Sequence, residues 1–322
     1  MRAPKSKGVN AMAQVQLRKK HRFFRREDIS LWLMALPTIL FLLIFCYAPM
    51  FGLIMAFQNL NVAKGILASP FVGFKNFEFL FATTDAWVIT RNTVCYNLVF
   101  ICVNMFFAVL LALLLSELTF RKTAKTLQTI YMLPYFLSWA VVSIILIAFL
   151  DRDYGLVNAF IRMTGARGMT DWYAVSEIWP GLLVFINAWK NVGYQTVLYL
   201  AVISGISQDY YEAAVLDGAS KFQQAWYITV PHLRLIMAIS IIMAMGSIFR
   251  GDFGLFYVVT KNSGRIYDVT DVIDTYIYRG LTQLSNVGMS TAAGLYQSVV
   301  GFIMVLFANW VVTKIDPDSA MF

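Results

Sequence analysis

Long stretches without a charged side chain dominate this sequence, and they restrict it to folds that can cross a lipid bilayer. A helix needs about 20 apolar residues to cross a hydrocarbon core of about 30 Å. Six stretches come close to or exceed this length; Lys190 interrupts the fourth, and Arg234 lies near the start of the fifth. They are residues 29–63, 92–116, 126–150, 178–208, 231–249 and 280–313.

The composition supports the same interpretation. Of the 322 residues, 59% are hydrophobic and 14% are charged, whereas a soluble domain has about 45–50% apolar and about 25% charged residues. The apolar stretches extend almost from end to end. We therefore expect one all-α, polytopic membrane domain (29–315) with about six transmembrane helices, a basic N-terminal tail (1–28) and a short C-terminal tail (316–322).

The orientation of the spans follows from the first tail. The formal net charge is +8, and Lys and Arg crowd into residues 1–28. A basic run can bind nucleic acid, but beside a first span it favours a cytoplasmic anchor. Six spans return both termini to one side. We expect both to be cytoplasmic, although the later loops discriminate weakly and the first helix carries the argument.

The sequence contains no set of residues that indicates catalysis. His21 and His232 have no partner at a metal-ligand or nucleophile spacing. The cysteines lie in apolar spans and are expected to be small buried hydrophobes rather than a disulfide framework. The phosphate-binding pattern G-x-x-x-x-G-K-[ST] is absent from the sequence. The chain should not bind ATP by that route.

One connection between spans, residues 207–231, has strong local signals for two short helices. Asp209 is expected to cap the first, with Glu212 reaching back to the cap, and Ser220 with Gln223 forms a second capping box. Gly218 lies between them, where a helix end favours a residue that tolerates left-handed geometry. The predicted structure is a helix, a sharp bend and a second helix outside the membrane.

The side chains of this loop suit an interaction site. Ala213 and Ala214 would let a partner approach closely. An exposed apolar cluster usually marks such a site; the alternative is a loop that folds onto its own membrane domain. Large aromatic residues, which a solvated loop does not need, are Tyr210, Tyr211, Phe222 and Trp226.

The loop also closely resembles the EAA loop of permeases in binding-protein-dependent ABC importers, whose pattern is E-A-A-x3-G-x9-I-x-L-P. Val230 stands where leucine is usual, which is a conservative departure. Segments 71–77, 271–281 and 308–315 are similar to the branch that imports polysaccharides and uronate oligosaccharides. The matching residues are Glu212, Ala213, Ala214, Gly218, Ile228 and Pro231.

This resemblance implies a type I ABC importer permease fold with a cytoplasmic coupling helix in a bacterial inner membrane. The chain would be a pore subunit that moves an oligosaccharide, acidic and alginate- or uronate-like, by alternating access. It would be no enzyme and hold no cofactor. The implied partners are a second homologous permease in a heterodimer, two cytoplasmic ATPase subunits that bind ATP and Mg, and an extracytoplasmic binding protein.

The resemblance also assigns roles in ATPase coupling. Glu212 and Gly218 would hold the shape of the loop, and Ala213 and Ala214 would make its close contact with the ATPase. Asp217 and Lys221 would be polar contacts at the rim of that contact. Ile228 and Pro231 complete the motif.

A polar patch in the fourth span supplies the substrate candidates. Charge inside a span is expensive and usually functional. Lys190 could bind sugar hydroxyls or a carboxylate, or it could pair structurally with Asp252. Arg250 and Asp252 could line the cavity, pair locally or lie at the interface. The other residues of the patch are Asn187, Trp189, Asn191 and Tyr194. Weaker candidates, whose alternative role is to join helices, are Asn97, Asn104 and Asn309.

Two other functions remain open at this stage. A secondary transporter would need an ion or proton site and would often show an inverted repeat, and neither is evident. A membrane scaffold or sensor subunit would use the loop to bind a signalling partner. Dependence on ATP separates the three functions. The sequence leaves the sugar, its length and the pairing of permeases open.

Overall fold

The structure, a computed structural model, describes residues 26–61, 63–78, 84–164 and 169–315. These residues are mostly helical, and extended pairing among them is limited to one isolated bridge between Gln58 and Phe71. The predicted all-α class is confirmed. The chain separates into two compact units, Met1–Gly52 and Leu53–Phe322, and each is described by itself.

The first unit is built on helix α1 (Arg26–Leu42), which contains Pro37. A π-helical turn, η1 (Leu43–Tyr47), follows it and leads to the 3-10 segment η2 (Ala48–Phe57). The described side chains of α1 are all exposed. A helix that is apolar on every side suits lipid rather than water. Ser30–Phe57 is a 28-residue helix long and apolar enough to cross a membrane.

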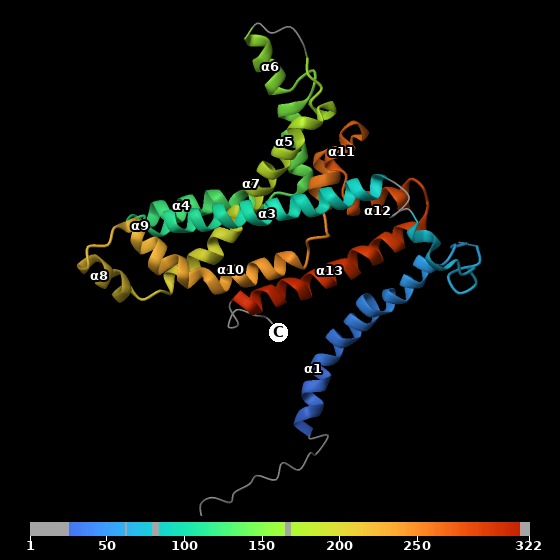
Figure 1. Cartoon of the computed structure of the whole chain (residues 1–322), viewed down its shortest axis with the longest axis horizontal. Helices are drawn as coiled ribbons and strands as arrows, with labels where there is room; N and C mark the ends of the chain where they lie inside the picture. The colour runs from blue at the N-terminus through green and yellow to red at the C-terminus, as the bar shows by residue number, and fades with distance from the viewer. Residues whose placement is uncertain (1–25, 62, 79–83, 165–168, 316–322) are drawn as a thin grey trace, which may run out of the picture. The chain divides into compact units, whose positions relative to one another are not determined.

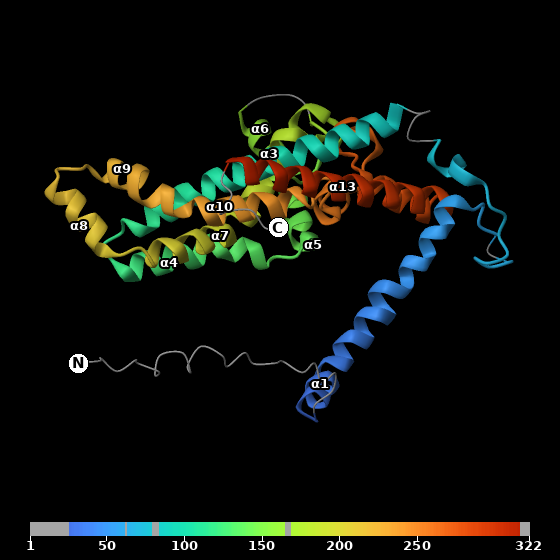
Figure 2. The same cartoon turned by 60° about the horizontal axis from the view of Figure 1, so that its bottom comes forward.

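Long helices form a bundle in the second unit, where α3, α10 and α13 run side by side (Figure 1 and Figure 2). α3 and α7 share the largest interface between two helices. Ala108 and Ala112 of α3 are fully buried in a cluster with Leu233 of α10, and such small residues let membrane helices approach closely. The long helices are α3 (Thr84–Ser116), α7 (Trp179–Ser204), α10 (Val230–Met245) and α13 (Val287–Ile315).

Shorter elements connect these long helices. The π-helical segment η8 (Gly254–Val259) places Phe256 in a buried cluster, 5.0 Å from the ring of Tyr96. The three cysteines are free, but they lie exposed on the chain rather than buried as expected. The other short elements are η3 (Gly73–Phe77), α6 (Leu156–Met163), η5 (Trp172–Ala174), η6 (Ser176–Ile178), η9 (Gly264–Ile266), α11 (Tyr267–Thr270) and α12 (Ile273–Thr282).

The third predicted span, 126–150, is broken rather than continuous. Its two halves, Lys122–Phe136 and Trp139–Leu150, meet at an angle of 96°. Pro134 has no backbone N–H to continue a helical ladder, and Ser138 caps the second half by accepting a hydrogen bond from the Val141 N–H. The elements are α4 (Arg121–Met132), η4 (Leu133–Phe136) and α5 (Trp139–Leu150).

Helices occur in all six predicted segments, with corrected boundaries. By length and composition, four described helices can cross a membrane, or five if the bent pair counts as one span. The remaining predicted segment is α7. Its 26 residues would extend about 39 Å, which exceeds the hydrocarbon core of about 30 Å. The last span starts at Val287 rather than 280, because Ser285 adopts left-handed backbone geometry and separates α12 from α13.

The close packing of α7 on α4 predicts a position-specific effect on stability. A β-carbon at Gly193 would lie 1.9 Å from the Tyr131 carbonyl oxygen. We expect Gly193→Ala to destabilise the protein by about 1–3 kcal/mol through overpacking, seen as a lower unfolding midpoint in detergent. Gly181→Ala, on the same helix with no atom within 4 Å of the new carbon, should be neutral or stabilising. Equal midpoints for the two variants would contradict this packing.

Candidate functional site

The loop 207–231 begins with helix α8 (Gln208–Leu216), whose N-cap is Ser207. The Ser207 hydroxyl accepts a hydrogen bond from the Asp209 N–H at 3.3 Å and donates one to the Asp209 carboxylate at 3.1 Å. The predicted cap at Asp209 with Glu212 is therefore wrong by two residues, because Ser207 already takes the extended cap conformation. Asp209 instead lies in the first turn, where the helix dipole favours a carboxylate.

The end of α8 has the predicted bend at Gly218, where φ is +77°. The Ala219 N–H donates to the Ala214 carbonyl at 2.8 Å, and the Gly218 N–H donates to the Val215 carbonyl at 3.0 Å. This pair of bonds is a Schellman motif. A β-carbon at Gly218 would meet no atom within 4 Å, so backbone conformation rather than space requires glycine here.

The second half of the loop starts with the predicted capping box. The Ser220 N–H donates to the Gln223 side chain at 2.7 Å, and the Gln223 N–H donates to the Ser220 hydroxyl at 3.3 Å. The helix that follows is not a separate short one, as predicted, but continues as a 25-residue span, Lys221–Met245. It comprises α9 (Lys221–Gln224), the π-helical turn η7 (Ala225–Thr229) and α10.

Three contacts hold this loop in place. The Tyr211 hydroxyl hydrogen-bonds to the Thr229 hydroxyl at 2.9 Å and so ties α8 to η7. The buried Gln224 donates to the carbonyl of residue 219 at 3.0 Å. Lys221, expected at a polar rim, forms an ion pair with Glu117 after α3 at 3.0 Å. Exposed pairs of this kind contribute about 0–1 kcal/mol.

Most of the loop surface is uncovered, so it folds onto its own chain only in part. Leu216 is 88% and Phe222 77% exposed, and α8 and α9 extend at one end of the bundle (Figure 1). Ala214 and Ile228 are half-buried. Exposed apolar groups in a rigid loop are typical of an interaction site. Further exposed residues are Tyr210, Glu212, Ala213, Val215, Asp217, Trp226, Tyr227 and Pro231.

A second feature is a polar groove of about 240 Å³ between α3, α7 and α10. The amide of Asn104 donates to the Asn187 side-chain oxygen at 2.8 Å across the two helices. The Asn104 oxygen is buried and has no hydrogen-bond partner among the described residues. The polar lining, which is uncharged over the described residues, consists of Asn97, Asn104, Asn187, Asn191, Gln195, Ser240 and Ser247.

The sequence interpretation found only part of this groove. Asn187 and Asn191 were among the candidates, and Asn97 and Asn104 were the weaker ones. Gln195 was missed although it continues the four-residue spacing of Asn187 and Asn191, which places all three on one side of α7. Ser240 of α10 and Ser247, which follows that helix, carry no distinguishing signal in the sequence. Asn309 is buried elsewhere, on α13.

The other residues of the polar patch do not line the groove. The buried Lys190 ammonium donates to the Pro134 carbonyl at 3.4 Å, to the Tyr135 carbonyl at 2.9 Å and to the Leu137 carbonyl. Tyr194 stacks on Tyr135 with 4.5 Å between ring centroids. Trp189 is 40% exposed on α7.

Arg250 and Asp252 also lie outside the groove lining. The Arg250 side chain is exposed, and its carbonyl accepts a hydrogen bond from the groove residue Asn97 at 3.0 Å. The Asp252 carboxylate accepts hydrogen bonds from the backbone N–H groups of Gly254 and Leu255, at the start of η8. Among the described residues no direct ion pair joins Asp252 to Lys190, although the two charges still interact at longer range; the alternative of a structural pair is therefore not seen as a direct contact.

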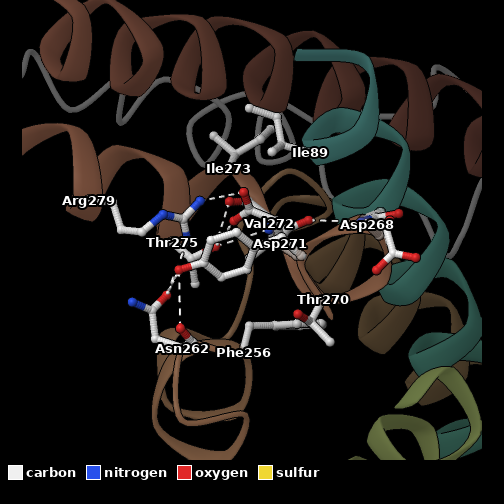
Figure 3. Close-up of polar contacts among 12 residues, drawn as sticks. Ile89, Phe256, Asn262, Asp268, Thr270, Asp271, Val272, Ile273, Thr275 and Arg279 are labelled. Carbon is white, nitrogen blue, oxygen red and sulfur yellow. Dashed lines mark hydrogen bonds and ion pairs between the residues drawn. The ribbon is translucent and has the colours of Figure 1, made fainter. Parts of the chain in front are cut away.

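A buried charge network at the opposite end of the bundle from α8 was not predicted (Figure 3). Asp271 forms an ion pair with Arg279 and accepts a hydrogen bond from the Thr275 hydroxyl at 2.6 Å. The Arg279 guanidinium lies 4.1 Å from the Tyr267 ring centroid. Asn92 of α3 donates to the Asp271 carbonyl at 3.0 Å. These bonds fix α11 and α12 against α3 and make them a rigid cap.

Comparison with protein families gives an extended match. The family described as "Binding-protein-dependent transport system inner membrane component" matches residues 87–317. Protein LplB of Bacillus subtilis (strain 168) is 34% identical and aligns over 91% of this chain and 92% of its own length. The polygalacturonan/rhamnogalacturonan transport system permease protein YteP of the same organism is 32% identical over 90% of this chain and 89% of its own length.

Solved structures give a matching fold. A chain of a bacterial ABC transporter involved in the import of the acidic polysaccharide alginate superimposes with a TM-score of 0.82 at 32% identity, over 90% of this chain and 97% of that one. A bacterial alginate ABC transporter in complex with an alginate pentasaccharide-bound periplasmic protein gives a TM-score of 0.80 at 32% identity, over 90% and 96% of the two chains.

The capping box predicts a local change in protection from hydrogen exchange. Ser220→Ala removes the acceptor for the Gln223 N–H, and loss of an N-cap costs about 1 kcal/mol. We expect faster amide exchange in residues 221–224 of the purified protein, with its unfolding midpoint unchanged. Ser204→Ala is the matched control, because that hydroxyl only donates to the Leu200 carbonyl at the end of α7. Equal exchange rates in the two variants would show that the box does not order the loop.

Proposed function

The chain belongs to the family of inner membrane components of binding-protein-dependent transport systems, and we propose that its loop 207–231 couples it to a separate ATPase. It is a multi-pass permease subunit of a sugar or oligosaccharide ABC importer, with the type I permease fold. It supplies a path through the membrane rather than a catalytic site.

The exposed surface of the loop supports the coupling role. Glu212 and Ala213 face solvent on α8, Ala214 beside them is half-buried, and Leu216 adds a large apolar side chain at the tip. The Schellman motif and the capping box keep this surface in one shape, so docking costs little ordering entropy. Since the loop continues directly into Lys221–Met245, a displacement of its docked end reaches the spans through an unbroken helix.

The partners follow from one loop serving one ATPase. Two ATPase subunits, which bind ATP and Mg, need two docking loops, and a second homologous permease supplies the other in a heterodimer. Closure of the ATPase pair would move both loops and switch the spans between inward-open and outward-open states. An extracytoplasmic binding protein delivers the sugar to the outer side of the membrane. The two termini and the loop 207–231 would then face the cytoplasm.

The polar groove supports the substrate part of the proposal. Amide and hydroxyl side chains from α3, α7 and α10 offer donors and acceptors that suit sugar hydroxyl groups. We propose an acidic oligosaccharide, because a relative is named for polygalacturonan and rhamnogalacturonan transport and a similar structure for alginate import. The carboxylates of such a sugar need cations outside this uncharged lining. The exposed Arg250, next to Asn97, is a candidate on this chain.

The coupling role is tested by a substitution that changes backbone strain and charge at the loop. Gly218→Asp places a side chain at φ +77°, at a cost of about 1–2 kcal/mol, and adds charge to the docking surface. In proteoliposomes with the complete complex, we expect ATP-driven uptake of an alginate or galacturonan oligosaccharide to fall about tenfold, within the range of coupling mutations.

Gly65→Asp is the matched control, because Gly65 has φ +76° and equally open surroundings in the segment between η2 and η3, away from the loop in sequence. This variant should transport like the wild type. Normal uptake in Gly218→Asp, or an equal loss in both variants, would contradict coupling through the loop.

The groove is tested by removing one of its polar groups. Gln195→Leu keeps the size of the side chain and removes its hydrogen-bonding atoms. Loss of one hydrogen bond of about 1 kcal/mol lowers affinity about fivefold. We expect that decrease in equilibrium binding of a labelled acidic oligosaccharide to the detergent-purified complex. Ser298→Ala, an exposed α13 hydroxyl that donates to the Gly294 carbonyl, should bind normally. Unchanged binding by Gln195→Leu would place the sugar elsewhere.

A further inference from the structure

The break in the third span is an unusual feature for a segment composed of apolar residues. Backbone groups inside a bilayer have no water to bond with, so a broken helix survives only where the protein satisfies its free carbonyls. The break between α4 and α5 exposes the carbonyls of Pro134, Tyr135 and Leu137 to α7, and the first of them also accepts the Leu137 N–H at 3.1 Å. All three accept hydrogen bonds from one group, the Lys190 ammonium of α7.

The surroundings of the Lys190 ammonium match its bonding capacity. A lysine ammonium has three donors and no acceptor, and here three carbonyls receive them. The nitrogen also lies 5.2 Å from the ring centroid of Trp139 and 5.9 Å from that of Tyr135, the residues on either side of the bend. Cations are attracted to aromatic faces at such distances. The position of the Lys190 charge is therefore set by the carbonyls and rings at the break rather than by the polar groove.

Two glycines hold the break tightly between neighbouring elements. A β-carbon at Gly193 of α7 would lie 1.9 Å from the Tyr131 carbonyl oxygen, and one at Gly254 of η8 would lie 1.9 Å from the Trp139 ring. The backbone of α7 thus contacts the end of α4, and the backbone of η8 contacts the start of α5. The segment between them has little space in which to change its angle while Lys190 is bonded.

Helix α4, the half of the broken span on the side of the loop 207–231, begins next to that loop. Glu117 follows α3 and forms an ion pair with Lys221 at 3.0 Å. Helix α4 starts four residues later, at Arg121. A displacement of the loop can therefore reach α4 through this pair, and the angle at the break decides whether α5 follows.

We propose that Lys190 is a positioning residue for transport, which locks the angle between α4 and α5 so that the broken span moves as one rigid lever. The proposal rests on the proposed coupling role of the loop 207–231. It assigns to Lys190 neither a sugar contact nor a pairing with Asp252. In this account ATP drives a movement of α4, and the bonds of Lys190 pass that movement on to α5.

The test measures the angle directly with spin labels on the two halves. Exposed Ile130 on α4 and Ile144 on α5 are replaced by cysteine and labelled in the full complex, after serine replaces the three native cysteines. Pulsed electron spin resonance then gives the distance distribution without nucleotide and with vanadate-trapped ATPase. With Lys190 present, we expect one narrow distribution that is the same in both states.

Lys190→Met keeps the length of the side chain and removes its donors. We expect its distance distribution to widen by about twofold or more and to differ between the two states. Uptake should fall about tenfold, while ATP hydrolysis and oligosaccharide binding stay within about twofold of wild type. Lys190→Arg, which restores donors, should return the narrow distribution. Lys314→Met, which removes another lysine lying over an aromatic ring, should leave the distribution unchanged.

A narrow, state-independent distribution in Lys190→Met would overturn the proposal. Loss of oligosaccharide binding with that narrow distribution would assign Lys190 to the sugar instead. If Lys190→Met does not assemble, Lys190→Leu, which has a shorter side chain without donors, decides the question by the width of its distance distribution: widening supports the lock and a wild-type width overturns it. The distances do not depend on transport, so a wild-type complex that fails to take up sugar would count against the proposed function alone.

Discussion

A bilayer offers no hydrogen bonds to a polypeptide backbone, and the arrangement of this chain depends on that constraint. Where the sequence is continuous and apolar, as in Thr84–Ser116, helical bonds satisfy every interior carbonyl. Where the helix breaks between α4 and α5, the carbonyls of Pro134, Tyr135 and Leu137 receive a donor from another helix, the Lys190 ammonium. An expensive buried charge is thereby retained because it allows a bent span to exist. Two glycines then bring α7 and η8 close to the same bend.

The chain has two kinds of exposed apolar surface, which face different surroundings. The side chains of α1 are apolar on every side and suit lipid. The loop 207–231 instead places Leu216 and Phe222 among Glu212, Asp217 and other polar groups, which suits a protein partner rather than a hydrocarbon core. A rigid, capped loop that is continuous with a span links the two environments mechanically. The polar groove between α3, α7 and α10 lies within the elements that such movement would displace.

Sequence could identify features encoded by local chemistry. Gly218 and the Ser220–Gln223 pair act within a few residues, so their geometry was predictable. The apolar runs likewise gave the helices. Contacts between distant segments could not be predicted: apolar composition does not encode the 96° bend of the third span. Lys190 was therefore assigned to sugar or to Asp252, although its partners are carbonyls more than fifty residues away. Only part of the groove lining was predicted, because the amides of α7 recur at a four-residue spacing that can be recognised in the sequence, whereas the single serines have no such pattern.

The central claim, that the loop 207–231 docks on an ATPase, is tested most directly by cross-linking in native membranes. A photoreactive phenylalanine analogue would replace Phe222, which is 77% exposed in the loop, or Phe74, which is 75% exposed in η3. Because η3 lies between the first two spans, a cytoplasmic N-terminus puts it on the outer side of the membrane. On irradiation, the account predicts a cross-link from position 222 to the ATPase subunit, with a yield that changes when ATP is trapped, and none from position 74. Equal labelling from both positions, or no ATPase adduct from position 222 in an assembled and active complex, would contradict it.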